Sequence, residues 1–240
     1  NDVIGQKIED GRYDGSYVQP AMIDGETFCD DVKTTEEYLE LMDMLDEFIW
    51  MAEFMQEPID LKGLLFPKDE LLYYDKYNSG EGYRICFVDT ADEGDDYFCA
   101  VFGEVVGNSV FVFDVIYNQD DLTFNEALLI GRIRENQTRY LVVETNNAGA
   151  YFKRNIQQQL KGVQVWGQFN KSNKHGRIIS MSGIIKKFFK FKKTNDKEYR
   201  LYLNYLTTYM RTHTNKHDDA PDATAGLANH IAVMMKMWMN

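Results

Sequence analysis

The sequence is poor in the residues that would indicate a disulfide-stabilised or zinc-binding protein. Of its 240 residues, three are cysteine and four are proline. Cys29, Cys86 and Cys99 are odd in number and lack metal-ligand spacing, which argues against a disulfide framework and against a zinc site. Cys86 and Cys99 fall in apolar, strand-like runs, so we expect both to pack in a core in a reducing compartment.

Long apolar runs are also absent. No uninterrupted apolar stretch is long enough to cross a bilayer, and the first residues do not form a secretory signal, so we expect no membrane partner. The chain begins at Asn1 rather than at Met, and we expect it to be a piece of a longer protein. It has no Gly-x-x-x-x-Gly-Lys-Ser/Thr phosphate loop, so it is not expected to be a nucleotide-driven motor by itself.

Basic residues are scarce overall, and they are concentrated in one segment. The formal net charge of the chain is −12, which by itself argues against a nucleic-acid partner. Residues 1–80 hold 20 acidic and 6 basic residues, whereas residues 151–216 hold 15 basic residues and only Asp196 and Glu198 as acids. Such a polarised chain has to be interpreted segment by segment, and the second segment can attract phosphates.

The sequence changes character near Gly80, where we place a domain boundary. Residues 1–80 are predicted to form an acidic extension and linker, and residues 81–240 the main domain. Residues 34–37, Thr-Thr-Glu-Glu, resemble a capping box in front of one helix expected over residues 38–55.

The main domain shows alternating strand and helix patterns. Strands are expected at residues 84–88, 97–106, 110–117, 140–143 and 163–169. Helices are expected over residues 123–136, from Asn146 or Asn147 to about Leu160, and after Pro221. A three-stranded meander followed by helix-connected strands predicts an α/β fold. Its mixed β-sheet would contain three antiparallel strands plus parallel strands, flanked by helices.

Carboxylates end two of the expected strands. Asp89 follows the strand at residues 84–88, and Glu144 follows the strand at residues 140–143. Ligand sites collect at the carboxyl ends of strands in sheets with helical crossovers. If these two strands are parallel neighbours, Asp89 and Glu144 meet at one edge of the sheet.

A third group of carboxylates begins the last helix. Residues 217–225 contain Asp218, Asp219 and Asp222, with Pro221 in the position of a first helical turn. Asp219 and Asp222 lie three residues apart and share a helix face. One Asp is enough to cap a helix, whereas several close together repel unless a cation gathers them. Capping and metal binding therefore both remain open for this group, with Asp218 the weaker candidate.

These motifs together resemble a known family, the nuclease domain of the large terminase subunit of tailed bacteriophages, in the RNase H-like superfamily. The similar motifs are Asp-Thr-Ala-Asp from Asp89, Glu-Thr-Asn-Asn-Ala-Gly from Glu144 and His-Asp-Asp-Ala-Pro-Asp-Ala from His217. The connector from Trp50 to Pro58, followed by Gly-Leu-Leu-Phe at residues 63–66, resembles the passage from motor ATPase to nuclease in that family.

The resemblance implies a metal-dependent endonuclease that cuts concatemeric viral double-stranded DNA during genome packaging. Asp89 would bridge two ions, Glu144 would be the second acid, and Asp219 and Asp222 would supply the last acidic motif. Oxygen-only ligands suit two Mg²⁺ or Mn²⁺ ions. Residues 1–80 would then be the remnant of an ATPase domain. The expected partners are DNA, the portal protein and the small terminase subunit, in the host cell cytoplasm.

Lysines interleaved with phenylalanines follow the last expected strand. We expect basic side chains there to bind DNA phosphates without reading base sequence. An amphipathic element with Phe inward and solvated Lys is the ordinary alternative, and the two are compatible. The DNA-binding candidates are Lys171, Lys174, Arg177, Lys186, Lys187 and Lys190.

Two other functions are compatible with the same residues. The first is a resolvase-like, structure-specific nuclease that acts on branched DNA. The second is a non-catalytic module that docks on the portal or on another terminase subunit, with vestigial acids. The terminase-like connector argues against the resolvase, and metal-dependent cutting would distinguish a nuclease from a docking module.

Overall fold

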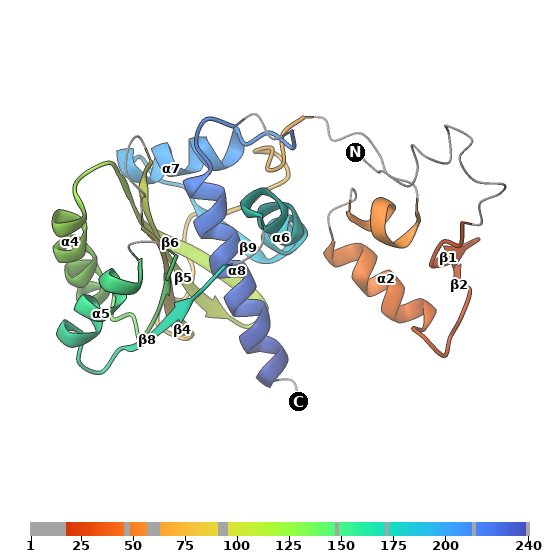
Figure 1. Ribbon diagram of the computed structural model, residues 1–240, viewed down its shortest axis with the longest axis horizontal. Coiled ribbons are helices and arrows are strands. Elements are labelled where there is room, and N and C mark those ends of the chain that lie inside the picture. The colour runs from red at the N-terminus through yellow and green to blue at the C-terminus, as the bar shows by residue number, and fades with distance from the viewer. Residues whose placement is uncertain are drawn as a thin grey trace. The chain divides into compact units, whose positions relative to one another are not determined.

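The structure is a computed structural model that describes residues 18–45, 49–56, 63–90, 96–146, 149–170, 173–212 and 215–238. The chain divides into two compact units. The smaller unit comprises residues 1–43 and 47–60, and the larger comprises residues 44–46 and 61–240. Figure 1 shows the elements of both, and each unit is described by itself.

The smaller unit contains a short hairpin and two helical segments. Their bounds are β1 (Met22–Ile23), β2 (Glu26–Thr27), α2 (Thr35–Met44) and the π-helical turn η1 (Trp50–Phe54). The expected capping box is confirmed at the start of α2. The Thr34 N–H donates to Glu37 Oε2 at 2.8 Å, and the Glu37 N–H donates to Thr34 Oγ1 at 3.3 Å.

The single helix expected over residues 38–55 is wrong, because α2 ends at Met44 and η1 is a separate turn. The rings of Tyr38 and Trp50 lie 6.3 Å apart, and Trp50 stacks on Phe54 at 5.1 Å. In one straight helix, residues 38 and 50 would lie about 18 Å apart along the axis. Bringing these aromatic rings into one cluster therefore requires the chain to change direction between them.

The larger unit is built on a seven-stranded mixed sheet in the order β3-β9-β6-β5-β4-β7-β8. Strands β4, β5 and β6 form the expected antiparallel meander, and β7, β8, β9 and β3 each pair in parallel with a neighbour. The predicted mixed sheet is confirmed. The strand bounds are β3 (Leu72–Tyr74), β4 (Tyr83–Asp89), β5 (Phe98–Val106), β6 (Ser109–Asn118), β7 (Tyr140–Glu144), β8 (Gln164–Gln168) and β9 (Phe189–Lys192).

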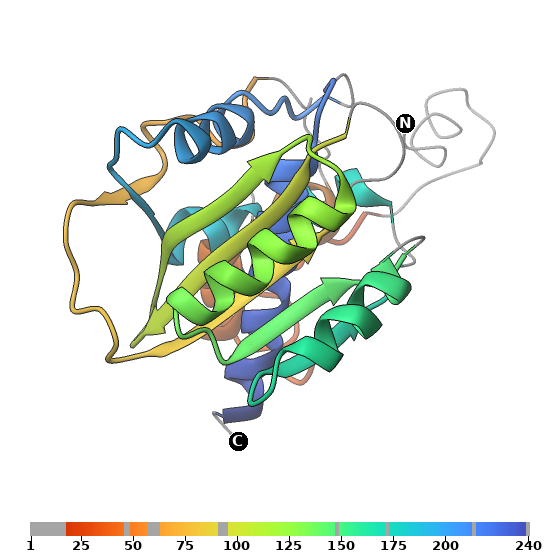
Figure 2. The same ribbon diagram turned by 90° about the vertical axis from the view of Figure 1, so that its left-hand side faces the viewer.

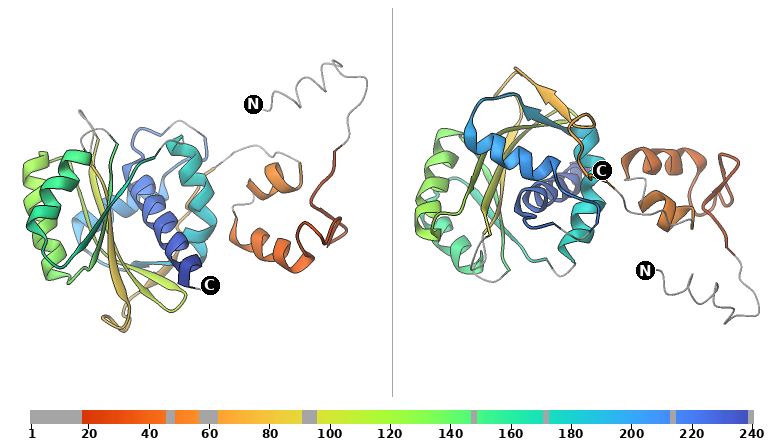
Figure 3. Two further views of the ribbon diagram at one scale, coloured as in Figure 1. Left: turned by 60° about the horizontal axis from the view of Figure 1, so that its bottom comes forward. Right: turned by 90° about the horizontal axis from the view of Figure 1, so that it is seen from above.

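Helices cover both faces of this sheet. Figures 2 and 3 show α4 and α5 on one face, and α6, α7 and α8 on the other. The helix bounds are α4 (Leu122–Glu135), α5 (Gly149–Gln159), α6 (Lys174–Phe188), α7 (Lys197–Thr207) and α8 (Asp219–Trp238). Among the described helices, none has the length and apolar character needed to cross a membrane.

The basic segment adds a strand that the sequence pattern did not identify. β9 lies between β3 and β6, with Phe189 and Phe191 buried, Lys190 half-buried and Lys192 exposed. This alternation is typical of a strand with one buried face. The Phe-Lys repeat covers only four residues and follows a 15-residue helix directly, so its period is too short to stand out in the sequence.

Side chains alternate between the two faces of the sheet, and this alternation places the carboxylates at the ends of β4 and β7 on the same face. Cys86 and Val88 of β4, with Leu141 and Val143 of β7, pack in the core under α4 and α5. Since successive side chains of a strand point to opposite faces, the residues between and after them point to the α8 side. The predicted core positions of Cys86 and Cys99 are confirmed, because both side chains are fully buried.

Helix α8 lies directly against the sheet through a glycine. A Cβ atom added at Gly226 would lie 2.3 Å from the Phe87 ring of β4, which is closer than real contacts allow. A Cβ atom at Gly103 of β5 would lie 3.2 Å from Leu227 of α8. This close packing fixes the helix over β4 and β5, with its first turn near the carboxyl end of β4.

We predict that Gly226→Ala destabilises the protein by about 1–3 kcal/mol, because the Phe87 ring must move to make room. Gly131→Ala in α4 is the matched control, since nothing lies within 4 Å of a Cβ atom there. The control should be neutral or stabilise by about 0.5–1 kcal/mol through helix propensity. Urea unfolding followed by circular dichroism measures both, and equal midpoints for the two variants would contradict the packing argument.

Candidate metal site

Two carboxylates meet at the carboxyl edge of the sheet because β4 and β7 are parallel neighbours. Their register pairs Val88 with Val143, so Asp89 and Glu144 follow side by side. Both side chains point to the α8 face, as the alternation requires. Asp89 and Glu144 therefore meet at one edge of the sheet, because β4 and β7 are parallel neighbours.

The first turn of α8 brings a third carboxylate to the same place. The Asp222 N–H donates to the Asp218 carbonyl at 2.9 Å, which makes the first helical hydrogen bond, and Pro221 lies inside this turn. Asp222 is 3% exposed. One carboxylate oxygen from each of Asp89, Glu144 and Asp222 lies within 4.8 Å of the other two. Residues far apart in the sequence therefore form one buried cluster.

Asp219 lies in a second, adjacent group. One ligand atom each from Asp219, Asp96 and His217 lies within 4.8 Å of the other two. Asp219 Oδ2 also accepts a hydrogen bond from the Tyr97 N–H at 3.2 Å, and the His217 ring packs edge-on against the Tyr97 ring at 5.3 Å. Of the two acids left open by the sequence, Asp222 is the one that joins Asp89 and Glu144. Asp96 was not singled out by its sequence context.

The first turn of α6 inserts two cations among these acids. Lys174 Nζ lies 2.8 Å from Asp218 Oδ1, and 3.6 to 3.7 Å from oxygens of Asp89, Asp219 and Asp222. Lys174 was expected to bind DNA, but its ammonium group lies at the centre of the carboxylates.

Arg177 joins the cluster from the same helix face as Lys174, three residues later. Its Nη2 donates to both carboxylate oxygens of Asp222, at 2.8 and 3.0 Å, and lies 3.6 Å from Glu144. Arg177 was also expected to bind DNA, whereas here it braces two of the acids. Asn173 caps α6 through its side chain, which places Lys174 and Arg177 in the first turn of that helix.

The cluster retains excess negative charge. Five carboxylates (Asp89, Glu144, Asp218, Asp219 and Asp222) face two cations (Lys174 and Arg177), which leaves a formal charge of −3. Burial and the neighbouring acids raise the pKa of Asp89 well above its ordinary value, against the opposing effect of Lys174. Burial also raises the pKa of Asp222 to about 6 and raises that of Asp219.

These observations fit a divalent cation. Asp89 Oδ2 is buried and has no hydrogen-bond partner among the described residues, so it has an unused lone pair inside the cluster. The donors of Asp89, Glu144 and Asp222 are all oxygen, which hard ions such as Mg²⁺ and Mn²⁺ prefer.

The remaining DNA-binding candidates lie away from the acids. Lys186 forms an ion pair with Glu70 at 2.7 Å, and Lys190 lies over the Phe111 ring at 5.1 Å. Lys187 is exposed near the end of α6. Lys186 follows Lys174 by twelve residues, about 18 Å along the helix axis. Lys171 lies outside the described residues.

The other histidines have structural surroundings. His175 Nδ1 lies 2.7 Å from the Tyr209 hydroxyl, and its Nε2 lies 3.0 Å from the Arg211 carbonyl. His230 is half-buried with its ring against Trp166, and burial lowers its pKa. His213 lies outside the described residues.

This sheet order and the helices on its two faces define a ribonuclease H-like fold. Residues 88–188 match the family model described as terminase of bacteriophage T7, ribonuclease H-like domain. The resemblance to the nuclease domain of large terminase subunits is thereby confirmed for this part of the chain. Comparison with curated protein sequences gives no significant match.

Solved structures agree with this fold. The large terminase of a thermophilic bacteriophage, in complex with ADP, superposes with a TM-score of 0.62 at 12% identity. That match covers 84% of this chain and 53% of the phage protein, so the present chain spans about half the length of that terminase.

Two isolated nuclease domains are also similar. The human cytomegalovirus terminase nuclease domain, soaked with Mn, has a TM-score of 0.49 and 13% identity, over 70% of this chain and 94% of its own. The large terminase nuclease of the thermophilic phage G20c, with bound zinc, has a TM-score of 0.46 and 20% identity, over 65% of this chain and 92% of its own.

We predict a pH signature of the buried acids in the metal-free protein. Because the pKa of Asp222 is raised to about 6 in the folded state, the folded protein binds this proton more tightly than the unfolded chain. That stabilisation is complete below the ordinary Asp pKa and is lost as the pH rises through about 6. Asp222→Asn should therefore gain on the order of 1–3 kcal/mol relative to wild type between pH 4 and 7.

Denaturant unfolding in EDTA at several pH values measures this difference. Glu135→Gln, a change at an exposed acid of α4, is the control and should follow the wild-type profile. A constant stability difference between Asp222→Asn and wild type over this range would contradict the raised pKa.

Proposed function

We propose that this chain is the nuclease part of a large terminase subunit, a metal-dependent endonuclease that cleaves concatemeric viral double-stranded DNA during genome packaging. The observation that carries the proposal is the convergence of Asp89, Glu144 and Asp222 within 4.8 Å of one another. They come from β4, β7 and α8, at the strand ends where ligand sites collect.

We infer that the cluster binds two divalent ions, Mg²⁺ or Mn²⁺. Asp89 is the central ligand, because its buried Oδ2 has no hydrogen-bond partner among the described residues and the side chain lies beside both other acids. Glu144 and Asp222 complete the ligand set, and Asp219 lies beside it. When bound, such ions activate a water molecule and stabilise the leaving oxygen of a phosphodiester.

Neighbouring groups of the protein hold the carboxylate ligands in position before a metal ion binds. Arg177 fixes the carboxylate plane of Asp222 through two hydrogen bonds and lies within ion-pair distance of Glu144. The Tyr97 N–H orients Asp219. Lys174 reduces the repulsion between Asp89 of β4 and the acids at the start of α8, so the ligands stay assembled before a cation arrives.

Basic side chains outside the cluster supply the attraction for DNA. We retain Lys186, Lys187 and Lys190 as phosphate contacts, together with Lys171, because lysines bind the backbone without reading bases. Lys174 and Arg177 lie within the acidic cluster, and their expected contact with DNA stays a prediction. The portal protein and the small terminase subunit as partners, and the host cytoplasm as the location, follow from the resemblance and belong to the same proposal.

The decisive test is metal-dependent cleavage of plasmid DNA. Wild-type protein should nick and linearise supercoiled plasmid with Mn²⁺ or Mg²⁺, and EDTA should stop the reaction. Asp89→Asn and Glu144→Gln should each reduce the rate by more than about 100-fold, because metal ions contribute several kcal/mol to such a reaction. Glu135→Gln is the matched control and should retain the wild-type rate.

The other outcomes distinguish the alternatives. Intact plasmid at high concentrations of a folded protein would favour the docking module. Preferential cutting of four-way junctions over linear duplex would favour the resolvase. Cleavage that persists in both Asp89→Asn and Glu144→Gln would place the chemistry elsewhere and contradict the proposal.

We also predict that Lys174→Met increases the affinity for Mn²⁺ by about tenfold or more. The change removes a cation that lies 3.6 Å from oxygens of both Asp89 and Asp222 and raises the formal negative charge of the cluster by one. The metal-free variant should be less stable than wild type. Lys187→Met, at the other end of α6, is the control. Titration calorimetry measures both affinities, and equal values would contradict a competition between Lys174 and the ion.

A further inference from the structure

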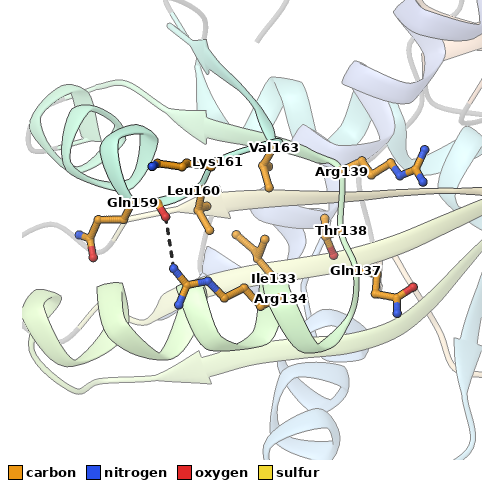
Figure 4. Close-up of a pocket in the computed structure, with 9 residues that line it drawn as sticks. All are labelled: Ile133, Arg134, Gln137, Thr138, Arg139, Gln159, Leu160, Lys161 and Val163. Atoms are coloured by element: carbon orange, nitrogen blue, oxygen red, sulfur yellow. Dashed lines mark hydrogen bonds between the residues drawn. The ribbon is translucent and has the colours of Figure 1, made fainter.

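A cavity with several basic residues in its lining lies at the edge of the sheet opposite to the acids. Its volume is about 550 Å³, within the range of small-ligand sites. The ends of α4 and α5 and the starts of β7 and β8 surround it, as Figure 4 shows. Arg139 directly precedes β7 and Glu144 ends it, so the cavity and the metal site are about 16 Å apart along that strand.

The lining of this cavity carries one sign of charge. Three of its nine described lining residues, Arg134, Arg139 and Lys161, are cationic, and none of the nine is acidic. Arg134 and Lys161 follow the ordinary preference for cations at helix carboxyl ends. Arg139 has no such reason, because it precedes a strand. We call this cavity the basic pocket.

A buried hydroxyl group in the basic pocket has no protein partner. Thr138 is 3% exposed, and its Oγ1 makes no hydrogen bond to any described residue. Its backbone N–H donates to the Ile133 carbonyl at 2.9 Å, so only the side-chain hydroxyl lacks a hydrogen-bond partner among the described residues. Such a group is unfavourable in the empty protein, and a bound acceptor would satisfy it. Figure 4 shows Thr138 between Ile133, Gln137 and Val163.

We propose that the basic pocket binds a phosphate group, with Thr138 as a hydrogen-bond donor and Arg134, Arg139 and Lys161 as charge partners. Three cations suit a doubly charged phosphate better than a single carboxylate, and arginine matches its geometry. Arg134 is already held toward the pocket, because its Nη2 donates to the Gln159 carbonyl at 3.2 Å. The apolar side chains of Ile133, Leu160 and Val163 also line the pocket, so an uncharged group attached to the phosphate can pack against them.

This site is independent of the proposed nuclease centre. The phosphate can come from free phosphate, from a nucleotide or from the backbone of DNA, and the same side chains would contact it in each case. The phosphate that would be cleaved at the metal site cannot also be the ligand of this pocket, because the strand β7 separates the two sites by about 16 Å.

Thr138→Val gives the sharpest test, because the proposal predicts opposite effects on stability and binding. Valine keeps the shape and removes the unpaired hydroxyl, so the ligand-free variant should melt at a higher temperature than wild type. The same variant should bind inorganic phosphate and deoxyadenosine monophosphate at least about fivefold more weakly. Arg139→Ala should weaken both ligands at least about tenfold. Arg154→Ala is the control, an exposed arginine of α5 outside the pocket.

Duplex DNA distinguishes the sources of phosphate. If the DNA backbone enters the pocket, Arg139→Ala should reduce the slope of log K against log salt by about one, and Arg154→Ala should not. An unchanged slope together with saturable binding of phosphate or nucleotide would assign the pocket to a free ligand. If neither small ligand binds saturably and the DNA slope is unchanged, or if Thr138→Val binds like wild type, the proposal is wrong.

Discussion

The mutual repulsion of buried carboxylates is the constraint on which the rest of this structure depends. Asp89, Glu144 and Asp222 lie close together in a poorly solvated place, where like charges raise the free energy of the folded state. The fold tolerates this because Lys174 and Arg177 enter from a separate helix and contact several acids at once. Two cations do not neutralise five acids, so the excess negative charge favours the binding of further cations.

Rigid packing keeps the acids close together despite their repulsion. The acids cannot relax by moving apart, since two of them end hydrogen-bonded parallel strands and the third begins a helix fixed against the sheet at Gly226. A side chain at that glycine would push the helix outward and increase the distance between Asp222 and Asp89. The energy of strand pairing and core packing thus maintains a ligand geometry that electrostatics alone would disperse.

The acids and the elements that carry them could be predicted from the sequence, but the position of the two cations between them could not. Short continuous apolar runs that end before Asp89 and Glu144, and a proline in the first turn after Asp218, are local signals that can be recognised without the tertiary structure. Lys174 carries no such signal: a lysine in a basic segment is ordinarily solvated, and only the packing of α6 against α8 brings it to the carboxylates. For the same reason the break between α2 and η1, which depends on aromatic rings meeting across a turn, could not be predicted from periodicity.

The charge of the cluster also has a consequence for the proposed substrate. When all five acids are ionised, their formal charge of −3 with the two cations repels a phosphodiester. A DNA backbone then approaches this edge of the sheet unfavourably while the cluster lacks added cations. In the proposed function, Lys187 and Lys190 would contact the duplex at a distance from the acids. They would not overcome this local repulsion, because screening limits the reach of their charges to about 8–10 Å. Divalent ions would reverse the sign of the local charge. In a nuclease built this way, the same ions that make the phosphodiester reactive would also admit it to the site, and binding at the acids and cleavage would depend on metal together.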